Sequence, residues 1–371
     1  MPWLGPAVGP RAAGDRVPDL SGGCPDAHNV AGAIDALRRG WPVAIDGVGF
    51  LPVETANEEA LAAFDSGAPA DLILSGHRAA TLKLANQRDA VPTGPVRIVR
   101  APWLDLAAAT AAADPALDLA TPLKGPFRTA PVEHGDAAGA ALTLGRLAGL
   151  LPAFFIGDAP ESAAAASAEA IRAAARADHL RIVSRAKLPT RFAEKTEIVA
   201  FRSEGDAAEH VALVIGDPNG AAPLVRLHSE CLTGDVFGSL KCDCGPQLDE
   251  ALAEIAAAGW GILLYLRQEG RGIGLINKLR AYALQDQGFD TVDANFRVGF
   301  ADDERDFAVA ARMLEALAQP RVRLLTNNPR KVAGLEAAGI EVVERVPLRA
   351  GENPHNRDYL AVKRRRSGHQ L

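Results

Sequence analysis

Short apolar runs separated by alanine-rich segments mark the first half of the chain. Strands are expected at residues 42–45, 72–74 and 96–99, because each run is short, mainly apolar and bounded by turn-forming or polar residues. A helix is expected between a cap at Asn29 and a stop at Gly40, since apolar residues recur there at helical spacing. The pattern predicts strands interleaved with helices.

Glycine and proline divide the second half more clearly. Strands are expected at residues 198–201, 210–215, 224–227, 261–266 and 322–325. One helix is expected from Pro246 to just before Gly259, a second ends at Gly288, and a third runs from Asn328 to Gly339. These residue types suit helix starts and ends. The middle helix should bury an apolar stripe of Ile276, Leu279, Ala283 and Leu284. Strands and helices mix without regular alternation, so we expect an α+β or mixed α/β fold.

The length and composition of the chain predict two domains. A chain of 371 residues is too long for one ordinary hydrophobic core. Residues 1–28, rich in Gly, Pro and Asp, are expected to form a loose leader in which Cys24 is an incidental thiol. Residues 162–178 are mostly alanine and predict a helix that leads to a junction near Asp178. The expected domains are residues 29–178 and 179–371.

Composition and charge narrow the class of protein. Apolar residues make up 48% and charged residues 23% of the chain, as in soluble globular proteins. The net charge of −6 gives no general attraction to nucleic acid, and no signal peptide or membrane span is recognisable. We therefore expect a cytoplasmic protein with no nucleic-acid or membrane partner. The basic residues 363–366 should form a solvated tail, with a phosphate or RNA contact as the alternative.

Three of the four cysteines, Cys231, Cys242 and Cys244, lie close together in the sequence. Clustered thiols in a cytoplasmic protein are typical of metal ligands rather than of disulfides. The spacing Cys-x10-Cys-x-Cys is not a common zinc-finger spacing, and three ligands leave one position of a tetrahedral zinc open for water, as hydrolysis requires. Cys242 and Cys244 should project to one side of an extended segment, and glycines should bend the loop back to Cys231. Three buried thiols without a metal are the alternative.

Three further segments carry charged residues suited to an anionic substrate. Residues 267–274, Arg-Gln-Glu-Gly-Arg-Gly-Ile-Gly, join an expected strand to an expected helix, where backbone N–H groups attract phosphate; an ordinary glycine turn is the alternative. Residues 326–331 form a second such connection, which ends in Lys331. Residues 302–306 should be a solvated turn unless they face the metal. Together these features indicate hydrolysis of a phosphorylated nucleotide, and they leave the base and the bond open.

In order and spacing, these motifs closely resemble GTP cyclohydrolase II, the entry enzyme of riboflavin synthesis. The similarity runs through residues 185–190, Arg-Leu-His-Ser-Glu-Cys-Leu-Thr-Gly-Asp at 226–235, Cys-Asp-Cys-Gly at 242–245, residues 267–275, Asn277 and Lys278 with Tyr282 and residues 284–286, residues 290–295 and Leu-Leu-Thr-Asn-Asn-Pro at 324–329. It covers about half the chain, and several separate motifs in register make it specific.

The resemblance implies zinc-dependent hydrolytic opening of the imidazole ring of GTP. C8 would leave as formate and the β- and γ-phosphates as pyrophosphate, giving 2,5-diamino-6-ribosylamino-4(3H)-pyrimidinone 5′-phosphate. Cys231, Cys242 and Cys244 match the zinc ligands. Mg²⁺ would bridge the triphosphate oxygens, and a homodimer is expected.

Further roles follow from the resemblance, residue by residue. The implied GTP contacts are Arg226, Leu227, His228, Ser229, Glu230, Gln247, Glu269, Gly270, Arg271, Thr291, Thr326 and Lys331. Asp303 matches a proton acceptor, Tyr282 a tyrosine near the reacting ring, and Arg305 a proposed nucleophile toward the α-phosphate. A guanidinium stays protonated in proteins, so stabilisation of transition-state charge is the physically easier role for Arg305. Both roles remain open.

The first half resembles 3,4-dihydroxy-2-butanone 4-phosphate synthase at residues 33–46 and 141–152. That enzyme is often fused ahead of GTP cyclohydrolase II. Where the synthase has an acidic run that holds Mg²⁺, this chain has Asp-Gly-Val-Gly-Phe-Leu-Pro at residues 46–52, and the later histidine-bearing motif is missing. We therefore expect a degenerate synthase-like α/β domain without synthase activity, useful for dimerisation or solubility.

Three alternative functions differ from this hypothesis. A diverged paralogue would open another ring, but the GTP-contact motifs are intact. A non-catalytic nucleotide-binding regulator would be expected to lose the cysteines or Asp303, and all of these are present. A bifunctional riboflavin enzyme is disfavoured by the missing acidic run.

Overall fold

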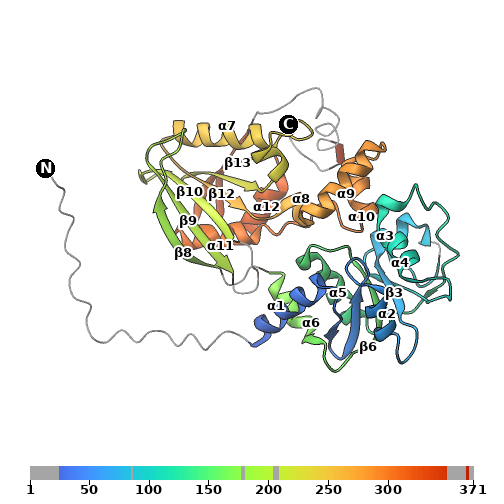
Figure 1. Ribbon diagram of the computed structural model, residues 1–371. Coiled ribbons are helices and arrows are strands. Elements are labelled where there is room, and N and C mark those ends of the chain that lie inside the picture. The colour runs from blue at the N-terminus through green and yellow to red at the C-terminus, as the bar shows by residue number, and fades with distance from the viewer. Residues whose placement is uncertain (1–24, 85–86, 177–179, 204–208, 349–364, 367–371) are drawn as a thin grey trace, which may run out of the picture.

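The computed structural model describes residues 25–84, 87–176, 180–203, 209–348 and 365–366. In these residues, two seven-stranded sheets with helices on both faces follow one another along the chain (Figure 1). We call residues 25–176 the N-terminal lobe and residues 180–348 the C-terminal lobe. The mixed α/β fold predicted from the sequence is confirmed. The expected junction near Asp178 and most of the expected leader lie outside the described residues.

The N-terminal sheet is mostly antiparallel, in the order β5-β4-β3-β6-β2-β1-β7. Its strands are β1 (Val43–Ile45), β2 (Val48–Pro52), β3 (Asp71–Ser75), β4 (Pro95–Ile98), β5 (Thr129–Ala130), β6 (Ala153–Asp158) and β7 (Ala164–Ala166). Its helices are α1 (Pro25–Arg38), α2 (Glu58–Phe64), α3 (Gly76–Thr81), α4 (Leu106–Ala113), the 3-10 helix η2 (Pro115–Leu117), α5 (Gly135–Ala148) and α6 (Ala168–Ala174). Side chains alternate between the faces of the sheet: Phe154 packs with α1 and α5, and Phe155 packs on the opposite side.

Two sequence predictions in this lobe are wrong in detail. Helix α1 begins at Pro25, inside the expected leader, and not after Asn29; a proline suits a first turn because its missing N–H has no helical partner there. The expected helix over residues 162–178 is instead strand β7 followed by α6. The alanines of β7 pair in parallel with β1, so sheet pairing overrides their helix propensity.

A two-residue turn joins β1 to β2 at the position where the synthase resemblance requires an acidic loop. Ile45 pairs with Val48, and between them Asp46 (φ 49°) and Gly47 (φ 85°) adopt left-handed conformations. This is the backbone of a tight hairpin, for which Asp-Gly is a favoured pair. The Asp46 carboxylate accepts a hydrogen bond from the Ala168 backbone N–H at 3.3 Å. Asp46 therefore fastens the turn to the start of α6.

The C-terminal sheet has a parallel half and an antiparallel half, in the order β14-β13-β11-β12-β10-β9-β8. Its strands are β8 (Leu180–Lys187), β9 (Thr196–Ser203), β10 (Glu209–Gly216), β11 (Leu224–Ser229), β12 (Trp260–Leu266), β13 (Arg321–Leu325) and β14 (Glu341–Val346). Its helices are the π-helix η3 (Leu232–Val236), α7 (Cys244–Ala257), α8 (Glu269–Gly272), α9 (Gly274–Asp286), α10 (Thr291–Val298), α11 (Ala308–Ala316) and α12 (Pro329–Ala337). Strands β11, β12 and β13 are parallel, so they end at the same edge of the sheet. Each strand predicted in this half is confirmed.

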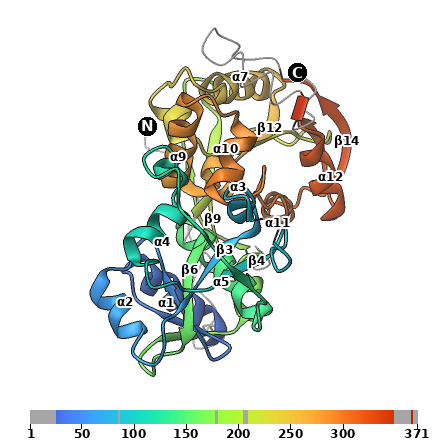
Figure 2. The same ribbon diagram turned by 90° about the vertical axis from the view of Figure 1, so that its right-hand side faces the viewer.

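The two lobes share one hydrophobic core. Helices α9 and α10 extend from the C-terminal sheet to the N-terminal lobe, where α10 packs against α3 and α9 against η2 (Figures 1 and 2). This core joins Leu72 and Phe155 of the N-terminal lobe to Leu284 and Val298 of the two helices. α9 and α10 therefore belong structurally to both lobes.

The predicted apolar stripe of α9 is partly wrong. Ile276 and Leu279 are exposed, at 52% and 46%, whereas Leu284 is buried as expected. The buried face also contains the polar residues Asn277 and Lys278. Polar groups are buried in native proteins when they have partners, and both residues have them, as described below. The helix therefore turns a polar face inward.

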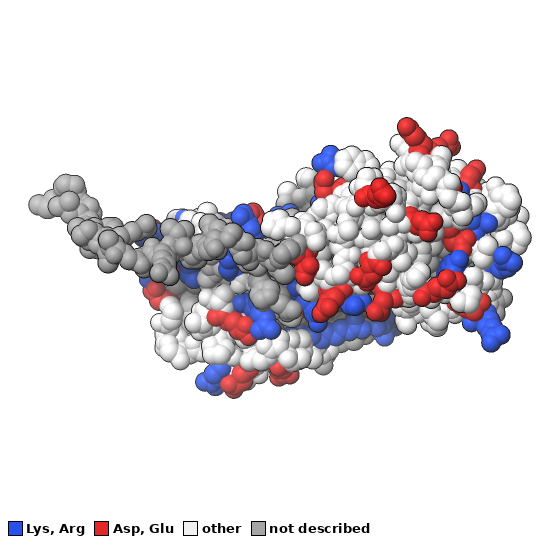
Figure 3. Space-filling view, turned by 90° about the horizontal axis from the view of Figure 1, so that it is seen from below, with Lys and Arg blue, Asp and Glu red and all other residues white. Residues whose placement is uncertain are grey.

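Figure 3 shows the lower face of the N-terminal lobe as largely uncharged, with scattered acidic side chains and fewer basic ones. In the described part of the chain, no helix combines the length and apolar character needed to cross a membrane. Within the expected basic tail, Arg366 pairs with Asp290 and Asp293 at the start of α10, at 2.5 and 2.8 Å. This residue of the tail thus contacts the C-terminal lobe; residues 363–364 lie outside the described ranges.

Candidate active site

Three loops meet at the edge of the C-terminal sheet where β11, β12 and β13 end. β11 leads to Cys231, β12 leads to residues 267–273, and β13 leads to residues 326–328 before α12. Open α/β sheets bind ligands at the carboxyl ends of their parallel strands. Here the loops line a pocket of about 1150 Å³, its open mouth included. The expected strand-to-helix connections are therefore confirmed, and they face one cavity.

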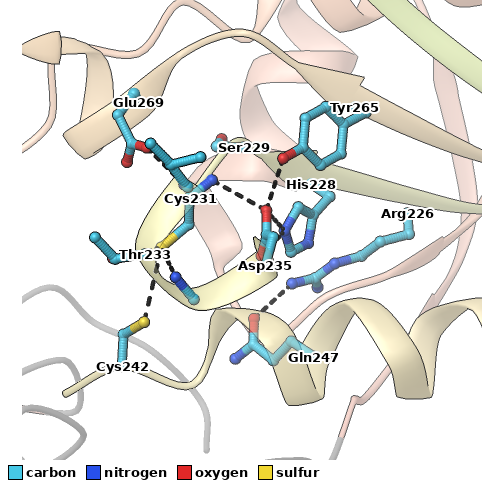
Figure 4. Close-up of polar contacts among 12 residues, drawn as sticks. Arg226, His228, Ser229, Cys231, Thr233, Asp235, Cys242, Gln247, Tyr265 and Glu269 are labelled. Atoms are coloured by element: carbon cyan, nitrogen blue, oxygen red, sulfur yellow. Dashed lines mark hydrogen bonds and ion pairs between the residues drawn. The ribbon is translucent and has the colours of Figure 1, made fainter. Parts of the chain in front are cut away.

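The three cysteines converge at one side of this pocket, and Figure 4 shows Cys231 and Cys242 facing each other. The three sulfur atoms lie within 4.8 Å of one another, and Cys231 Sγ lies 3.7 Å from Cys242 Sγ. Cys244 begins α7, so the turn into a helix, and not an extended segment as expected, brings it to Cys242. A Cβ on Gly234 would lie 2.8 Å from Cys242 Sγ and 3.0 Å from Cys231 Sγ. Glycine at this position leaves the space that the sulfurs need.

The chemistry of the sulfur atoms fits a metal cation. Hydrogen bonds with Cys242 and Cys244, and then with Lys278, lower the pKa of Cys231. Hydrogen bonding to the Cys231 sulfur raises the pKa of Cys242 and Cys244. Three sulfur atoms this close together would repel one another as thiolates, and a divalent cation bound between them would relieve that repulsion, because a metal binds thiolates. The trio could hold a metal ion.

Lys278 is a site residue that the sequence patterns assigned to no role. Its Nζ lies 3.0 Å from Cys231 Sγ, 2.9 Å from Thr233 Oγ1 and 2.8 Å from Glu269 Oε1. Although burial opposes it, hydrogen bonds with Glu269 and Cys231 raise the pKa of Lys278. The buried ammonium therefore stays charged and balances the thiolate and the carboxylate. A lysine one turn before Tyr282 on a helix that borders the site is the signal that could have identified it.

A hydrogen-bonded group of three side chains supports the loop beside Cys231 (Figure 4). Asp235 accepts bonds from His228 Nε2 at 3.1 Å, from the Tyr265 hydroxyl at 2.8 Å and from the Cys231 backbone N–H at 3.0 Å. Burial lowers the pKa of His228 against the opposing effect of Asp235. The neutral imidazole donates through Nε2, and its Nδ1 has no hydrogen-bond partner among the described residues. Asp235 and Tyr265 were not predicted as site residues.

Arg226 and Gln247, both expected to contact substrate, are bonded to each other. Arg226 Nη2 donates to Gln247 Oε1 at 2.8 Å and Nη1 donates to the Leu325 carbonyl at 3.0 Å. Burial lowers the pKa of Arg226 to about 10, with Asp243 opposing this effect, so the guanidinium is cationic at neutral pH. Its Nε is buried and unpartnered within the described structure. A ligand in the pocket could satisfy this donor.

Lys331 and Leu227 meet through the backbone. Lys331 Nζ donates to the Leu227 carbonyl at 2.7 Å. The Leu227 side chain packs in the core of the C-terminal lobe, so a substrate contact from this residue would come from its main chain. Lys331 follows the capping residue Asn328 in the first turn of α12, where the helix N-terminus favours negative charge. The placement of a cation at this end of the pocket agrees with the sequence prediction.

The loop after β12 is held by its own charged residues. Glu269 Oε2 accepts a bond from the Leu232 backbone N–H at 2.7 Å. Gly270 (φ 62°) and Arg271 (φ 61°) are both left-handed, a conformation that costs energy for arginine. Arg271 is anchored by the Asp302 carbonyl at 3.1 Å and by an ion pair with the Asp302 carboxylate. The segment is therefore more constrained than an ordinary glycine turn.

Asp303 and Arg305 form a largely buried ion pair beside the pocket, which Arg305 lines. Arg305 Nε lies 2.8 Å from Asp303 Oδ1, and Nη2 lies 2.6 Å from Oδ2. Arg305 Nη1 also donates to Ser229 Oγ at 3.3 Å. Although burial opposes it, the hydrogen bonds from Arg305 lower the pKa of Asp303. Of this segment Arg305 lines the pocket, and the Asp303 side chain bonded to it is 9% exposed, so this pair does not belong to a solvated turn.

Other expected residues line the same cavity. Tyr282 shares a hydrogen bond with Thr233 at 3.4 Å, and burial raises the pKa of Tyr282. Thr291 Oγ1 accepts a bond from Gln285 Nε2 at 3.2 Å. Glu230 pairs with Arg267 at 2.8 Å, and burial raises the pKa of Glu230. Thr326 also lines the pocket, as do polar residues that were assigned no individual role from the sequence: Lys241, Gln285, Asn295, Asn327 and Asn328.

Comparisons with known proteins agree on the C-terminal lobe. The family model for GTP cyclohydrolase II matches residues 181–347. GTP cyclohydrolase-2 of Hahella chejuensis is 60% identical over 190 residues, covering 51% of this chain and 91% of that protein. The Escherichia coli protein of the same name is 58% identical over 193 residues, covering 52% and 98%.

One relative also spans the N-terminal lobe. GTP cyclohydrolase-2 of Azospirillum brasilense is 44% identical over 361 residues, covering 91% of this chain and 93% of that protein. A solved two-domain 3,4-dihydroxy-2-butanone 4-phosphate synthase from A. baumannii aligns over 85% of this chain and 98% of its own, with 17% identity and a TM-score of 0.31, which is too low to support a conclusion about fold. On the family match and the nearly full-length relative, the chain belongs to the GTP cyclohydrolase II family.

Proposed function

We propose that this protein hydrolyses GTP to 2,5-diamino-6-ribosylamino-4(3H)-pyrimidinone 5′-phosphate, formate and pyrophosphate, the first step of riboflavin biosynthesis. The reaction cleaves two C–N bonds at C8 and one phosphoanhydride bond, and it consumes three molecules of water. The observation that carries the proposal is the convergence of the cysteine trio with Arg226, Arg305 and Lys331 in one pocket. Family membership supports GTP as the substrate.

The metal of this site is proposed to be Zn²⁺, held by Cys231, Cys242 and Cys244. Three thiolates with an open fourth position suit zinc. When bound there, zinc would supply a Lewis acid and lower the pKa of a water molecule toward neutrality. Lys278 Nζ lies 3.0 Å from Cys231 Sγ, and its positive charge would help to hold this ligand as a thiolate.

Proton transfer is assigned to Asp303, and charge stabilisation to Arg305. In the structure the two residues neutralise each other, at 2.6 and 2.8 Å, so Asp303 is a weak base. An α-phosphate that draws Arg305 away would raise the pKa of Asp303 toward its ordinary value and make it a better proton acceptor. A guanidinium in an ion pair is a poor nucleophile, which favours the electrostatic role. Tyr282 would orient the reacting ring.

Binding of the nucleotide would use the remaining polar groups. Glu230 and Gln247 can hydrogen-bond the guanine edge, and His228 Nδ1 offers an acceptor that has no partner among the described residues. Lys331 and the first turn of α12 are suited to phosphate. Ser229, Glu269, Gly270, Arg271, Thr291, Thr326 and the Leu227 main chain complete the proposed contacts. Mg²⁺ is proposed to accompany the triphosphate, where it would neutralise part of the phosphate charge.

The test is a product assay on the full chain. Purified protein with GTP, Zn²⁺ and Mg²⁺ should release formate and pyrophosphate in equal amounts and produce the absorbance of the diaminopyrimidine. Pyrophosphate without formate would indicate phosphohydrolysis alone. Absence of formate in the presence of both metals would overturn the proposal.

The organisation of the whole chain is a separate proposal. We propose that residues 29–178 form a degenerate synthase-like domain without synthase activity, that residues 179–371 form the catalytic domain, and that the protein is a cytoplasmic homodimer. The tight Asp46–Gly47 turn supports the first point, because it leaves no acidic loop between β1 and β2. Sedimentation equilibrium measures the oligomeric state, and a mass equal to one 38.9 kDa chain would contradict the dimer.

A further inference from the structure

Helices α9 and α10 have one face in the pocket and another in the N-terminal lobe. Lys278 and Tyr282 of α9 and Thr291 of α10 line the pocket. On the other side, Leu284 and Val298 are fully buried in the core that both lobes share. A wall of the proposed GTP site is therefore also a wall of the N-terminal lobe.

Arg280 fastens α9 to the N-terminal lobe from the back of this wall. Its Nη2 lies 2.9 Å from Glu54 Oε1 and its Nε lies 3.2 Å from Asp114 Oδ2. The Arg280, Glu54 and Asp114 side chains are only 17%, 17% and 18% exposed. Removing one member of such a buried group leaves the others without compensation, so it is strongly unfavourable. The clamp therefore resists movement of α9.

The clamp continues into the backbone of both lobes. Arg280 Nη1 donates to Asn277 Oδ1 at 2.8 Å, and the fully buried Asn277 donates to the carbonyls of Ile273 and Leu150 at 3.0 and 3.4 Å. The second oxygen of Glu54 accepts a bond from the Leu151 N–H at 2.6 Å. Asn277 directly precedes Lys278. The N-terminal lobe is thereby connected to the residue that contacts Cys231.

A second set of contacts holds α10. Ser75 Oγ donates to the carbonyl of Gly299, the cap of α10, at 2.6 Å. Arg78, 1% exposed, binds both oxygens of Asp118 at 2.7 and 2.9 Å. Arg297 of α10 reaches the same carboxylate at 3.3 Å. Both helices of the wall are thus bonded to the N-terminal lobe by buried polar groups.

We propose that the N-terminal lobe is the support that positions the α9–α10 wall for the nucleotide, and that Arg280 is a positioning residue for GTP. This inference rests on the proposed function, since GTP is the probe. A small displacement of the wall would move Lys278, Tyr282 and Thr291 together, and misplacement of binding groups by about 1 Å can cost up to ~100-fold in rate. Half-length relatives that match over 91–98% of their own length indicate that the chemistry exists without this lobe. The lobe therefore acts on geometry and contributes no reacting group.

The test compares Arg280→Ala with the wild-type full chain, both loaded with zinc. Loss of the clamp should raise KM for GTP about tenfold and change kcat less than about threefold, because mainly binding geometry is lost. Amide hydrogen exchange in residues 276–286 should accelerate, and Arg280→Lys should recover part of the KM. Zinc content should stay at the wild-type value.

A matched control removes an ion pair of similar geometry inside the N-terminal lobe. Arg97 pairs with Asp71 at 2.7 Å and with Glu133 at 3.3 Å, and Arg97→Ala should lower thermal stability and leave KM unchanged. If Arg280→Ala does not fold, Glu54→Gln removes one charge of the clamp and keeps an acceptor for the Leu151 N–H.

The outcomes separate the two proposals. Unchanged KM and unchanged amide exchange in a folded Arg280→Ala variant would overturn the positioning role, as would an equal rise in KM for Arg97→Ala. A wild-type protein that releases no formate would instead overturn the proposed function. In that case amide exchange in α9 still decides whether the clamp holds the wall.

Discussion

The two lobes bury polar side chains for different purposes. Among the described residues, the N-terminal lobe buries Ser75, Arg78 and Thr129, and the first two bond across to α10. The C-terminal lobe buries a larger set, and several of its members face the cavity: Arg226, His228, Lys278, Asn295, Thr326, Asn327, Asn328 and Lys331. Burial of polar groups is costly without partners. Buried polar side chains that bond to the other lobe therefore mark a structural contact, and those that face the cavity mark a reactive site.

The loop that holds the cysteines and the loop at which the synthase family has its acidic run differ in a similar way. In the C-terminal lobe, the loop after β11 has room for three sulfur atoms because residue 234 is glycine. In the N-terminal lobe, the β1–β2 connection is shortened to Asp46 and Gly47, and Asp46 bonds to the backbone of α6. The N-terminal sheet thus has a tight hairpin at this connection, whereas the C-terminal sheet has an open loop. The comparison leads to five predictions.

The largest effect on activity is expected at the cysteine trio of the C-terminal lobe. Cys242→Ser should lower formate release by at least ~1000-fold, because loss of a thiolate ligand removes the metal that would stabilise developing charge. Metal analysis of the purified variant should show less than one zinc per chain. Cys24→Ser is the matched control and should change neither value. Full activity of Cys242→Ser would exclude the cysteine trio as the reactive centre.

A substitution at Arg305 can distinguish stabilisation of transition-state charge from covalent catalysis. If it stabilises charge, Arg305→Lys should lower kcat about 10- to 100-fold, because a point charge replaces the guanidinium fork. Arg312→Lys, in an exposed pair with Glu315 at 2.8 Å, should have no effect. Rapid quenching with GTP labelled in the α-phosphate provides the second measurement. Label bound covalently to the wild-type protein and absent from Arg305→Lys would identify Arg305 as a nucleophile instead.

The joint between the lobes can be weakened without touching the pocket. Gly299 has φ +107°, and a Cβ there would lie 2.8 Å from Pro152 Cγ and 2.9 Å from Ser75 Oγ. Gly299→Ala should therefore cost about 2–3 kcal/mol of stability through backbone strain and overpacking. Gly139→Ala, inside α5 with open space around it, should be neutral or stabilise by about 0.5–1 kcal/mol. Equal melting temperatures for the two variants would contradict a tight joint at Gly299.

A smaller effect is expected from acid on the Asp303–Arg305 pair. The pKa of Asp303 is lowered in the folded protein, so the pair stabilises the fold above the unfolded pKa of about 4. This contribution should disappear as the pH falls through the lower, folded pKa. Urea unfolding of wild type and Asp303→Asn should therefore differ at pH 7 and converge at the acidic end. A difference that grows toward low pH would have the wrong sign.

The loops that carry the motifs could be predicted from sequence because their charged residues and glycines lie directly between an expected strand and an expected helix. Each follows an apolar strand and precedes a helix, as the segments before Gly274 and Pro329 do, and parallel strands bring such loops to one edge. The cysteines were predicted for a similar reason, since scarcity and spacing are visible in one dimension. The position of Cys244 in the first turn of α7 was not predicted, because it depends on the close packing of Gly245 on Gly234.

Residues whose surroundings come from distant segments were not predictable. Helix α9 presents Ile276 and Leu279 to solvent and buries Asn277 and Lys278, the reverse of what hydrophobic periodicity indicates. Only the clamp on one side and the cysteines on the other explain this burial. Asp235 and Tyr265 were missed because their roles depend on partners from other elements: Asp235 accepts bonds from His228 and from Tyr265. Strand β7 was missed because three alanines favour a helix until β1 pairs with them.

The N-terminal lobe should show no chemistry of its own. Incubation of the full chain with ribulose 5-phosphate and Mg²⁺ is expected to yield no dihydroxybutanone phosphate, because the β1–β2 turn offers Asp46 alone where Mg²⁺ requires clustered oxygen ligands. Asp46 also accepts the Ala168 N–H at 3.3 Å, so a metal would have to compete with the start of α6. An active synthase assayed in parallel provides the control for the assay. Formation of product by this protein, and its loss in Asp46→Asn, would show that the hairpin is a working site and that the two lobes differ in substrate rather than in purpose.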